Sequence, residues 1–314
     1  MPGAELPMTL SSAAALSRGR RVYRFDDGGP GILVASAVDL DSFHARFLAQ
    51  WPMTRVADAT TDPPAIVIET VSDVGGSLLL RHPGLPDGGL ACADAAEAAN
   101  QLVGTLALEL GLRRPTWLSL HAGAAAGDGG LIALPGDSLS GKSTLAMQLA
   151  ARGLAFFGDD RLMLAPPRDG GRWRGVSLGL TPRVRLPVHP LAGTDYIAFV
   201  AARLTIEHRD AADRPLVATV DPASLGGKPF GSAAPLAAIV LPTRVEDPDT
   251  LDLRRAAAGE TMVALLRQVA APALASTALV ASLRALVAAV PAWRLTFGSS
   301  ARAADRLLEL SRGT

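Results

Sequence analysis

One glycine-rich segment constrains the fold of this 314-residue chain more than any other feature. Residues 136–144 read Gly-Asp-Ser-Leu-Ser-Gly-Lys-Ser-Thr and match the pattern Gly-x-x-x-x-Gly-Lys-Ser/Thr. Glycines let the backbone turn its N–H groups around phosphate oxygens, and the N-terminus of a following helix adds the positive end of its dipole. Leu131–Pro135 predicts a strand before this segment, and Lys142–Arg152 predicts a helix after it. Strand, glycine loop and helix predict an α/β protein that binds a nucleotide through its phosphates.

The residues of this segment have predicted roles. Lys142 is expected to reach the β- and γ-phosphates, and the Ser143 hydroxyl to ligate Mg²⁺. Only Lys142 and Lys228 are lysine among 30 basic side chains, which indicates that position 142 needs a slim ammonium rather than a planar guanidinium. ATP and Mg²⁺ are therefore the predicted cofactors. The predicted nucleotide-binding residues are Gly136, Asp137, Ser138, Leu139, Ser140, Gly141, Lys142, Ser143 and Thr144.

Two adjacent carboxylates, Asp159 and Asp160, follow the apolar run Leu154–Phe157, which predicts a strand. Phosphoryl transfer uses one carboxylate near Mg²⁺ and another to accept the proton of an attacking hydroxyl. We assign Asp160 to the metal together with Ser143, and leave open which aspartate is the base. The alternative is a solvated turn, for which Gly-Asp-Asp is ordinary chemistry.

The chain is predicted to divide into a smaller N-terminal α/β region, residues 1–115, and a larger region, residues 116–314. In the first region, Ala93–Leu110 predicts a helix capped by Gly111. Its predicted strands are Gly31–Ala35, Ala65–Glu69 and Ser77–Arg81.

In the second region, Trp117–His121 and Leu131–Pro135 predict two strands joined by a small, glycine-rich connection, Ala122–Gly130. Leu236–Leu241 predicts a central strand bounded by Pro235 and Pro242. Trp293–Phe297 predicts a further strand. The predicted C-terminal helices are Gly259–Val269, Thr277–Val290 and Ala301–Ser311.

His121, the glycine loop and Asp159-Asp160, in this order and at this spacing, resemble the catalytic core of the HPr serine kinase/phosphorylase family. The resemblance covers mainly residues 117–164. It implies a P-loop core similar to that of phosphoenolpyruvate carboxykinase, and an acceptor hydroxyl on a protein. It also implies catalytic roles for Asp159, Asp160, His121 and Lys142, with His121 close to the transferred phosphoryl group.

The chain departs from that family at its second signature, Glu-x-Arg-Gly-x-Gly. Residues 173–179, Trp-Arg-Gly-Val-Ser-Leu-Gly, are a partial counterpart that lacks the glutamate. That signature is tied to the dual kinase and phosphorolysis activity. The chain therefore looks more similar to the HPr-kinase-related proteins of peptide-modification gene clusters, including lasso-peptide kinases.

The predicted activity is transfer of the γ-phosphoryl group of ATP to a hydroxyl, a serine of a small protein or peptide. A P-loop ATPase or nucleotide-dependent switch, and a non-catalytic nucleotide-sensing subunit, are the alternatives. Arg183 and Arg185 would point to the same side of an extended segment and could stabilise phosphoryl charge or hold an acidic substrate. Lys228 could contact a phosphate or carboxylate from its loop; for all three residues, simple solvent exposure is the alternative.

Composition restricts the partners. Thirty basic and 30 acidic side chains cancel, so overall charge predicts neither nucleic-acid nor membrane binding. Cys92 is the only cysteine, which excludes an internal disulfide framework and fits a cytoplasmic setting. Self-association into a homo-oligomer is left open.

Overall fold

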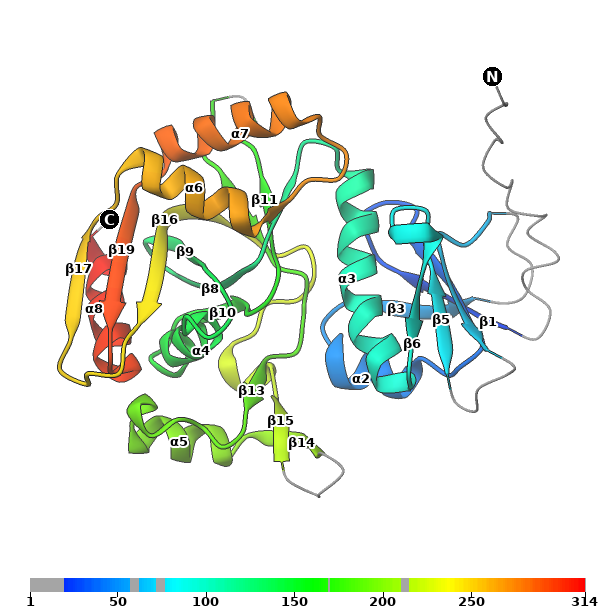
Figure 1. Ribbon diagram of the computed structural model, residues 1–314, viewed down its shortest axis with the longest axis horizontal. Helices are drawn as coiled ribbons and strands as arrows, with labels where there is room; N and C mark the ends of the chain where they lie inside the picture. Colours follow the sequence, from blue (N-terminus) through cyan, green and yellow to red (C-terminus); the bar gives the residue numbers. More distant parts are fainter. Residues whose placement is uncertain (1–19, 57–61, 72–76, 169, 210–214, 314) are drawn as a thin grey trace. The chain divides into compact units, whose positions relative to one another are not determined.

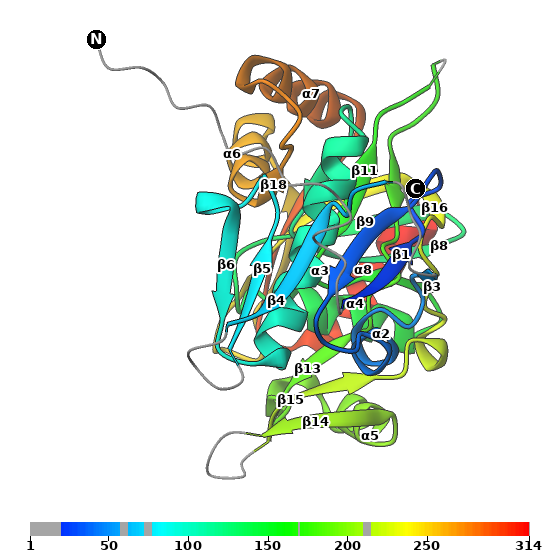
Figure 2. The same cartoon turned by 90° about the vertical axis from the view of Figure 1, so that its right-hand side faces the viewer.

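The computed structural model describes residues 20–56, 62–71, 77–168, 170–209 and 215–313, and shows a mixed α/β protein with several sheets (Figures 1 and 2). The described residues fall into two compact units: residues 20–44 with 53–109, and residues 45–52 with 110–313. Within the described ranges, no helix is long and apolar enough to cross a membrane.

The first unit is built on a six-stranded sheet with the order β3-β1-β2-β4-β5-β6. All neighbouring strands are antiparallel except β2 and β4. The strands are β1 (Arg21–Phe25), β2 (Ile32–Ser36), β3 (Met53–Val56), β4 (Ile66–Thr70), β5 (Leu78–Arg81) and β6 (Gly89–Cys92). The helices α2 (Asp41–Phe47) and α3 (Ala95–Arg113) begin in this unit and end in the second. The predicted strands and helix of this region are thus present.

Gly111 was predicted to cap the helix, but α3 continues past it to Arg113. The backbone at Gly111 stays helical, and a Cβ atom there would lie in tight contact with the Pro272 ring, at 3.3 Å. Glycine is therefore explained here by close packing rather than by a change of backbone direction.

The second unit contains a ten-stranded sheet with the order β10-β8-β9-β16-β12-β11-β7-β18; β19 also pairs with β16, and β17 with β19. β16 runs parallel to β9 and β19, and the other pairs are antiparallel. The strands are β7 (Leu118–Leu120), β8 (Ala122–Gly127), β9 (Gly130–Pro135), β10 (Ala155–Gly158), β11 (Leu162–Ala165), β12 (Arg174–Val176), β16 (Ala233–Arg244), β17 (Leu251–Arg255), β18 (Val269–Ala270) and β19 (Ala292–Phe297).

A smaller three-stranded antiparallel sheet with the order β13-β15-β14 completes this unit. Its strands are β13 (Arg183–Arg185), β14 (Leu204–Arg209) and β15 (Pro215–Val220). The helices of the unit are α4 (Lys142–Ala151), α5 (Thr194–Ala201), α6 (Ala258–Gln268), α7 (Ser276–Ala289) and α8 (Ser300–Gly313). The helices predicted after the glycine loop and near the C-terminus are confirmed to within two residues.

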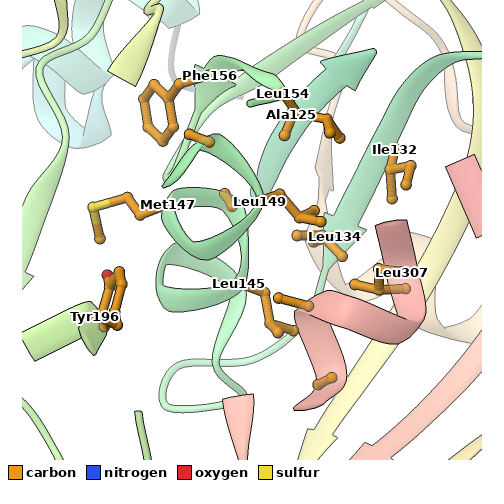
Figure 3. Close-up of a cluster of buried hydrophobic side chains, with 14 of the residues drawn as sticks. Ala125, Ile132, Leu134, Leu145, Met147, Leu149, Leu154, Phe156, Tyr196 and Leu307 are labelled. Carbon is orange, nitrogen blue, oxygen red and sulfur yellow. The ribbon is translucent and has the colours of Figure 1, made fainter. Parts of the chain in front are cut away.

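Alternating side chains of the large sheet belong to two separate apolar clusters, one on each face. Ala125, Ile132 and Leu134 point to one side, where α4, α5 and α8 supply residues such as Leu145 and Leu307 (Figure 3). On the opposite side, other residues of the same strands pack against residues of α6 and α7. The second unit is therefore a sheet covered by helices on both faces, and α4 is held firmly on one of them.

The connection Ala122–Gly130 was predicted to be a loop, and this prediction is wrong: most of it forms strand β8. Alanine and glycine have low strand propensity, so the local sequence carries no strand signal. Small residues are required here because α4 lies directly on the strand. A side chain at Gly123 would begin 2.7 Å from the Lys142 carbonyl oxygen.

The prolines predicted to bound the central strand lie inside it, since β16 extends from Ala233 to Arg244. Pro235 is opposite Arg174 of β12, and Pro242 is opposite Leu295 of β19. A proline removes one N–H donor from a ladder but keeps its carbonyl acceptor. Pairing along this long strand overrides the local signal.

The close approach of β8 and α4 can be tested with two glycines of the same strand. Gly123→Ala should lower the free energy of unfolding by about 1 to 3 kcal/mol, because the new methyl group meets backbone atoms of α4. Gly127→Ala is the matched control, since the atoms nearest its methyl group would be Leu154 side-chain atoms, at 3.4 Å or more. Chemical denaturation of both variants measures the difference, and equal stabilities would contradict the packing described.

Candidate active site

The glycine-rich loop connects the end of β9 to the first turn of α4. Gly141 has φ of 95°, and a side chain there would begin 2.7 Å from the Phe297 ring, so only glycine fits. Leu139 also has a left-handed backbone, with φ of 69°, and its side chain is 72% exposed. The loop is thus held in a special conformation at the N-terminus of a packed helix, where backbone N–H groups favour an anion.

Lys142 folds back onto this loop. Its side chain is buried, and Nζ donates to the Asp137 carbonyl oxygen at 2.9 Å. Burial lowers the pKa of Lys142, and this effect is opposed by the charges of Asp160, Asp137 and Asp159. A compact ammonium therefore lies inside the loop, where phosphate oxygens could replace the carbonyl as its partners.

Asp159 follows strand β10 and is buried, with 4% of its surface exposed. Burial raises its pKa to about 6, although the nearby Arg183 charge acts in the opposite direction. Its Oδ2 accepts from the Arg183 backbone N–H at 3.1 Å, and its backbone carbonyl accepts from Ser143 Oγ at 3.3 Å. This carboxyl group can accept a proton near neutral pH.

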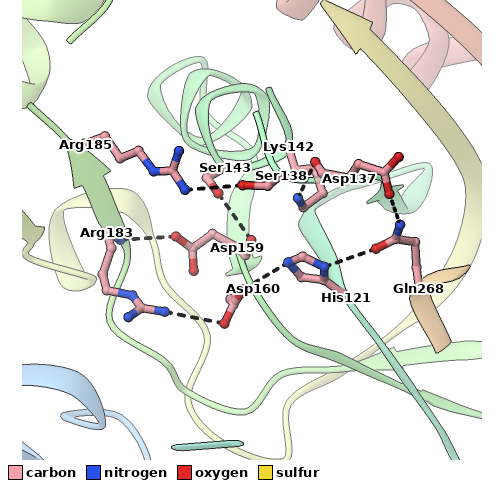
Figure 4. Close-up of polar contacts among 10 residues, drawn as sticks. All are labelled: His121, Asp137, Ser138, Lys142, Ser143, Asp159, Asp160, Arg183, Arg185 and Gln268. Carbon is pink, nitrogen blue, oxygen red and sulfur yellow. Dashed lines mark hydrogen bonds and ion pairs between the residues drawn. The ribbon is translucent and has the colours of Figure 1, made fainter. Parts of the chain in front are cut away.

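Asp160 lies in the opposite environment (Figure 4). His121 Nε2 is 3.1 Å from Asp160 Oδ1, and Arg183 Nη2 donates to Oδ2 at 3.4 Å. The hydrogen bond from His121 is the main cause that lowers the pKa of Asp160 to about 2. Two neighbouring carboxyl groups therefore differ strongly in proton affinity, a pattern that separates acid–base from electrostatic roles in active sites.

His121 is also contacted by a residue that the sequence did not point to. Its Nδ1 lies 3.1 Å from Gln268 Oε1, and its backbone N–H donates to the Gln268 carbonyl oxygen at 2.8 Å. Gln268 Nε2 in turn donates to Asp137 Oδ1 at 2.6 Å. Gln268 is 147 residues away from His121 and belongs to no motif, so only the pairing of β18 with β7 reveals it.

Several of these residues, though not Gln268, line one cavity of about 520 Å³ in the second unit. It brings together His121, Lys142, both aspartates and most of the loop, but not Gly136, Asp137 or Ser140. The cavity is lined by His121, Ser138, Leu139, Gly141, Lys142, Ser143, Thr144, Asp159, Asp160, Arg183 and Arg185, among others.

Arg183 and Arg185 line the same cavity, as expected for alternate residues of strand β13. Arg185 Nη2 donates to Ser138 Oγ at 3.3 Å, so one arginine contacts the loop while the other contacts Asp160. Lys228 is exposed and does not line the cavity. Tyr196 and Arg244 line it without having been singled out in the sequence.

The donor atoms fit a magnesium ion that is held mainly by phosphates. Among the residues that the structure describes, no group of three or more His, Cys, Asp or Glu side chains could hold a metal ion. Mg²⁺ in nucleotide sites needs fewer protein ligands, because it keeps several waters and binds one or two carboxylates together with substrate phosphates. Ser143 and Asp160 offer a hydroxyl and a carboxylate in the same cavity.

Comparisons with known proteins add a structural likeness. No protein-family profile matches the sequence, and no curated protein matches it significantly. Among solved structures, the chain is similar to the HPr(Ser) kinase/phosphatase from Coxiella burnetii, with 14% sequence identity and a TM-score of 0.31. The match covers 62% of this chain and 95% of that one. At this similarity it carries no argument about activity, substrates or partners.

The buried Asp159 gives stability a pH dependence. Because folding raises its pKa from 3.8 to about 6, its favourable contribution is present below about pH 4 and is lost as pH rises through 6. Asp159→Asn removes the buried charge and should raise the free energy of unfolding by up to about 3 kcal/mol near pH 7.5. The gain should vanish near pH 4, as measured by denaturation without added metal.

Asp160→Asn is the matched control. The pKa of Asp160 is lowered to about 2 in the folded chain, so its contribution is present above about pH 4 and is lost as pH falls through 2. This substitution should therefore destabilise the protein at neutral pH. A gain from Asp159→Asn that is equal at both pH values would contradict the assignment of a buried, proton-binding Asp159.

Proposed function

We propose that this chain is a P-loop kinase that transfers the γ-phosphoryl group of ATP to a hydroxyl, a serine of a small protein or peptide. The observation that carries the proposal is one cavity lined by a glycine loop at a helix N-terminus, a buried lysine and two carboxyl groups of unequal proton affinity. Groups that could bind phosphate and a group that could accept a proton line the same cavity, as phosphoryl transfer requires.

The loop and Lys142 would bind the nucleotide. Backbone N–H groups at the start of α4 would hold the phosphates, and the Lys142 ammonium would leave the Asp137 carbonyl for the β- and γ-phosphate oxygens. Ser143 and Asp160 would hold Mg²⁺, which supplies positive charge to the phosphates when bound. Arg183 and Arg185, on the facing strand, would stabilise the charge of the phosphoryl group.

Asp159 would act as the base. Its raised pKa lets it accept the proton of the acceptor hydroxyl near neutral pH, whereas Asp160 stays ionised. The hydroxyl oxygen forms a bond to the γ-phosphorus while the bond from that phosphorus to the β–γ bridging oxygen breaks. The proton moves to Asp159, and ADP leaves with the bridging oxygen. His121 would lie close to the transferred group.

The nature of the acceptor is proposed from the resemblance of His121, the loop and the acidic pair to HPr serine kinases. The smaller N-terminal α/β region, predicted as residues 1–115, would help to recognise this partner. Because the Glu-x-Arg-Gly-x-Gly signature has no full counterpart, we propose a kinase without the reverse, phosphorolytic reaction.

The two aspartates provide the test of phosphoryl transfer. Asp159→Asn should retain ATP binding, measured by calorimetry with Mg²⁺, and should lose transfer to serine-containing peptides encoded beside this gene, measured by intact mass. Loss of a positioned base costs about a hundredfold or more in rate. Unchanged transfer would contradict the base assignment. ADP release by the wild type without any acceptor would favour an ATPase or switch. ATP binding without turnover would favour a nucleotide-sensing subunit.

The two lysines of the chain provide a test of nucleotide binding. Lys142→Arg should weaken ATP binding by about tenfold or more, because a buried site shaped for an ammonium rejects the larger guanidinium. Lys228→Arg is the matched control, and it should leave the Kd unchanged because Lys228 is exposed outside the cavity. Equal Kd values for both variants and the wild type would contradict the assignment of Lys142 to the nucleotide site.

A further inference from the structure

A row of hydrogen-bonded side chains runs from the glycine loop to the acidic pair through Gln268 (Figure 4). Gln268 Nε2 donates to Asp137 Oδ1 at 2.6 Å, and Gln268 Oε1 lies 3.1 Å from His121 Nδ1. The other ring nitrogen of His121 lies 3.1 Å from Asp160 Oδ1. Gln268 is only 9% exposed, so water competes little for these bonds.

Asp137 determines which way the Gln268 amide faces. An ionised carboxylate can only accept hydrogen bonds, so the amide NH₂ group must be the part that faces Asp137. The amide oxygen is then left to face His121 Nδ1, which lies 3.1 Å away. A loop carboxylate thereby decides how the imidazole is held, although it does not touch the ring.

Asp137 is also where Lys142 is held in this structure. Its carbonyl oxygen accepts from Lys142 Nζ, while its side chain accepts from Gln268. A phosphate that binds the Lys142 ammonium would remove its hydrogen bond to Asp137, the residue that also accepts from Gln268. The Gln268 backbone is fixed beside His121, because the next two residues form β18 and pair with β7.

We propose that Gln268 is a positioning residue that couples the glycine loop to His121, so that a change at Asp137 is transmitted through the amide to the imidazole that faces Asp160. The coupling itself is a property of the contacts. Its consequence for phosphoryl transfer rests on the proposed function.

A cycle of four proteins tests the coupling without nucleotide: the wild type, Asp137→Ala, Gln268→Met and the double variant. The readout is the NMR cross-peak of the His121 Cε1–H group, assigned with a His121→Asn variant. Removing the Asp137 charge has a through-space effect in both backgrounds, but a transmitted effect only where Gln268 is present. Asp137→Ala should therefore displace the cross-peak at least about twofold more in the wild-type background, since interacting sites are non-additive.

Two further variants serve as controls for the cross-peak displacement. Gln268→Asn keeps an amide but is one methylene too short to span both partners, and it should behave as Gln268→Met does. Gln101→Met changes a partly buried glutamine of α3 and should leave the cross-peak in place. Equal displacement by Asp137→Ala in both backgrounds would overturn the proposal.

Activity separates this inference from the proposed function. Gln268→Met should lower kcat by about tenfold while the Kd for ATP changes less than about threefold, because the bridge orients His121 rather than the phosphates. Non-additive displacement in a protein that binds no nucleotide would support the coupling and reject the kinase. If the wild type transfers the phosphoryl group but Asp137→Ala displaces the cross-peak equally in both backgrounds, the kinase is supported and the coupling is rejected.

Discussion

The seating of α4 on strand β8 is the constraint on which the rest of the candidate site depends. Gly123 lets the helix approach until its first carbonyl lies against the strand, and Leu145 and Leu149 fix the helix in the apolar cluster below. The loop before α4 and the turn after β10, which is the next strand beyond β8, are thereby brought to one cavity. A shift of α4 would move Lys142 and Ser143 away from Asp159.

Within this frame, burial raises the pKa of Asp159, and the hydrogen bond with His121 lowers the pKa of Asp160. Asp159 is enclosed and retains protons to about pH 6, whereas Asp160 reaches His121 and Arg183 and stays ionised. The buried Lys142 also lines this cavity. Burying charged groups of both signs lowers the free energy of unfolding of the free protein. Binding of a ligand with complementary charges would offset this loss.

The sequence predicted the parts of this site that have a local signature. The loop, helix α4 and the strand before Asp159 follow from glycine spacing, helical periodicity and apolar runs. The alternation of Arg183 and Arg185 followed from strand geometry once the segment was taken as extended. What had no local signature was missed: β8 is made of alanine and glycine, and Gln268 becomes part of the site only through pairing of β18 with β7. Both depend on tertiary contacts that propensity does not encode.

The central claim, that the glycine loop binds the phosphates of ATP beside the acidic pair, is tested most directly by a crystal structure with Mg²⁺ and a non-hydrolysable ATP analogue. The account predicts β- and γ-phosphates at the N–H groups of Gly141, Lys142 and Ser143, with Lys142 Nζ moved from the Asp137 carbonyl to the phosphates. It predicts the metal between Ser143 Oγ, Asp160 and the phosphates. Phosphates bound elsewhere, or a loop that stays closed on Lys142 at saturating analogue, would contradict it.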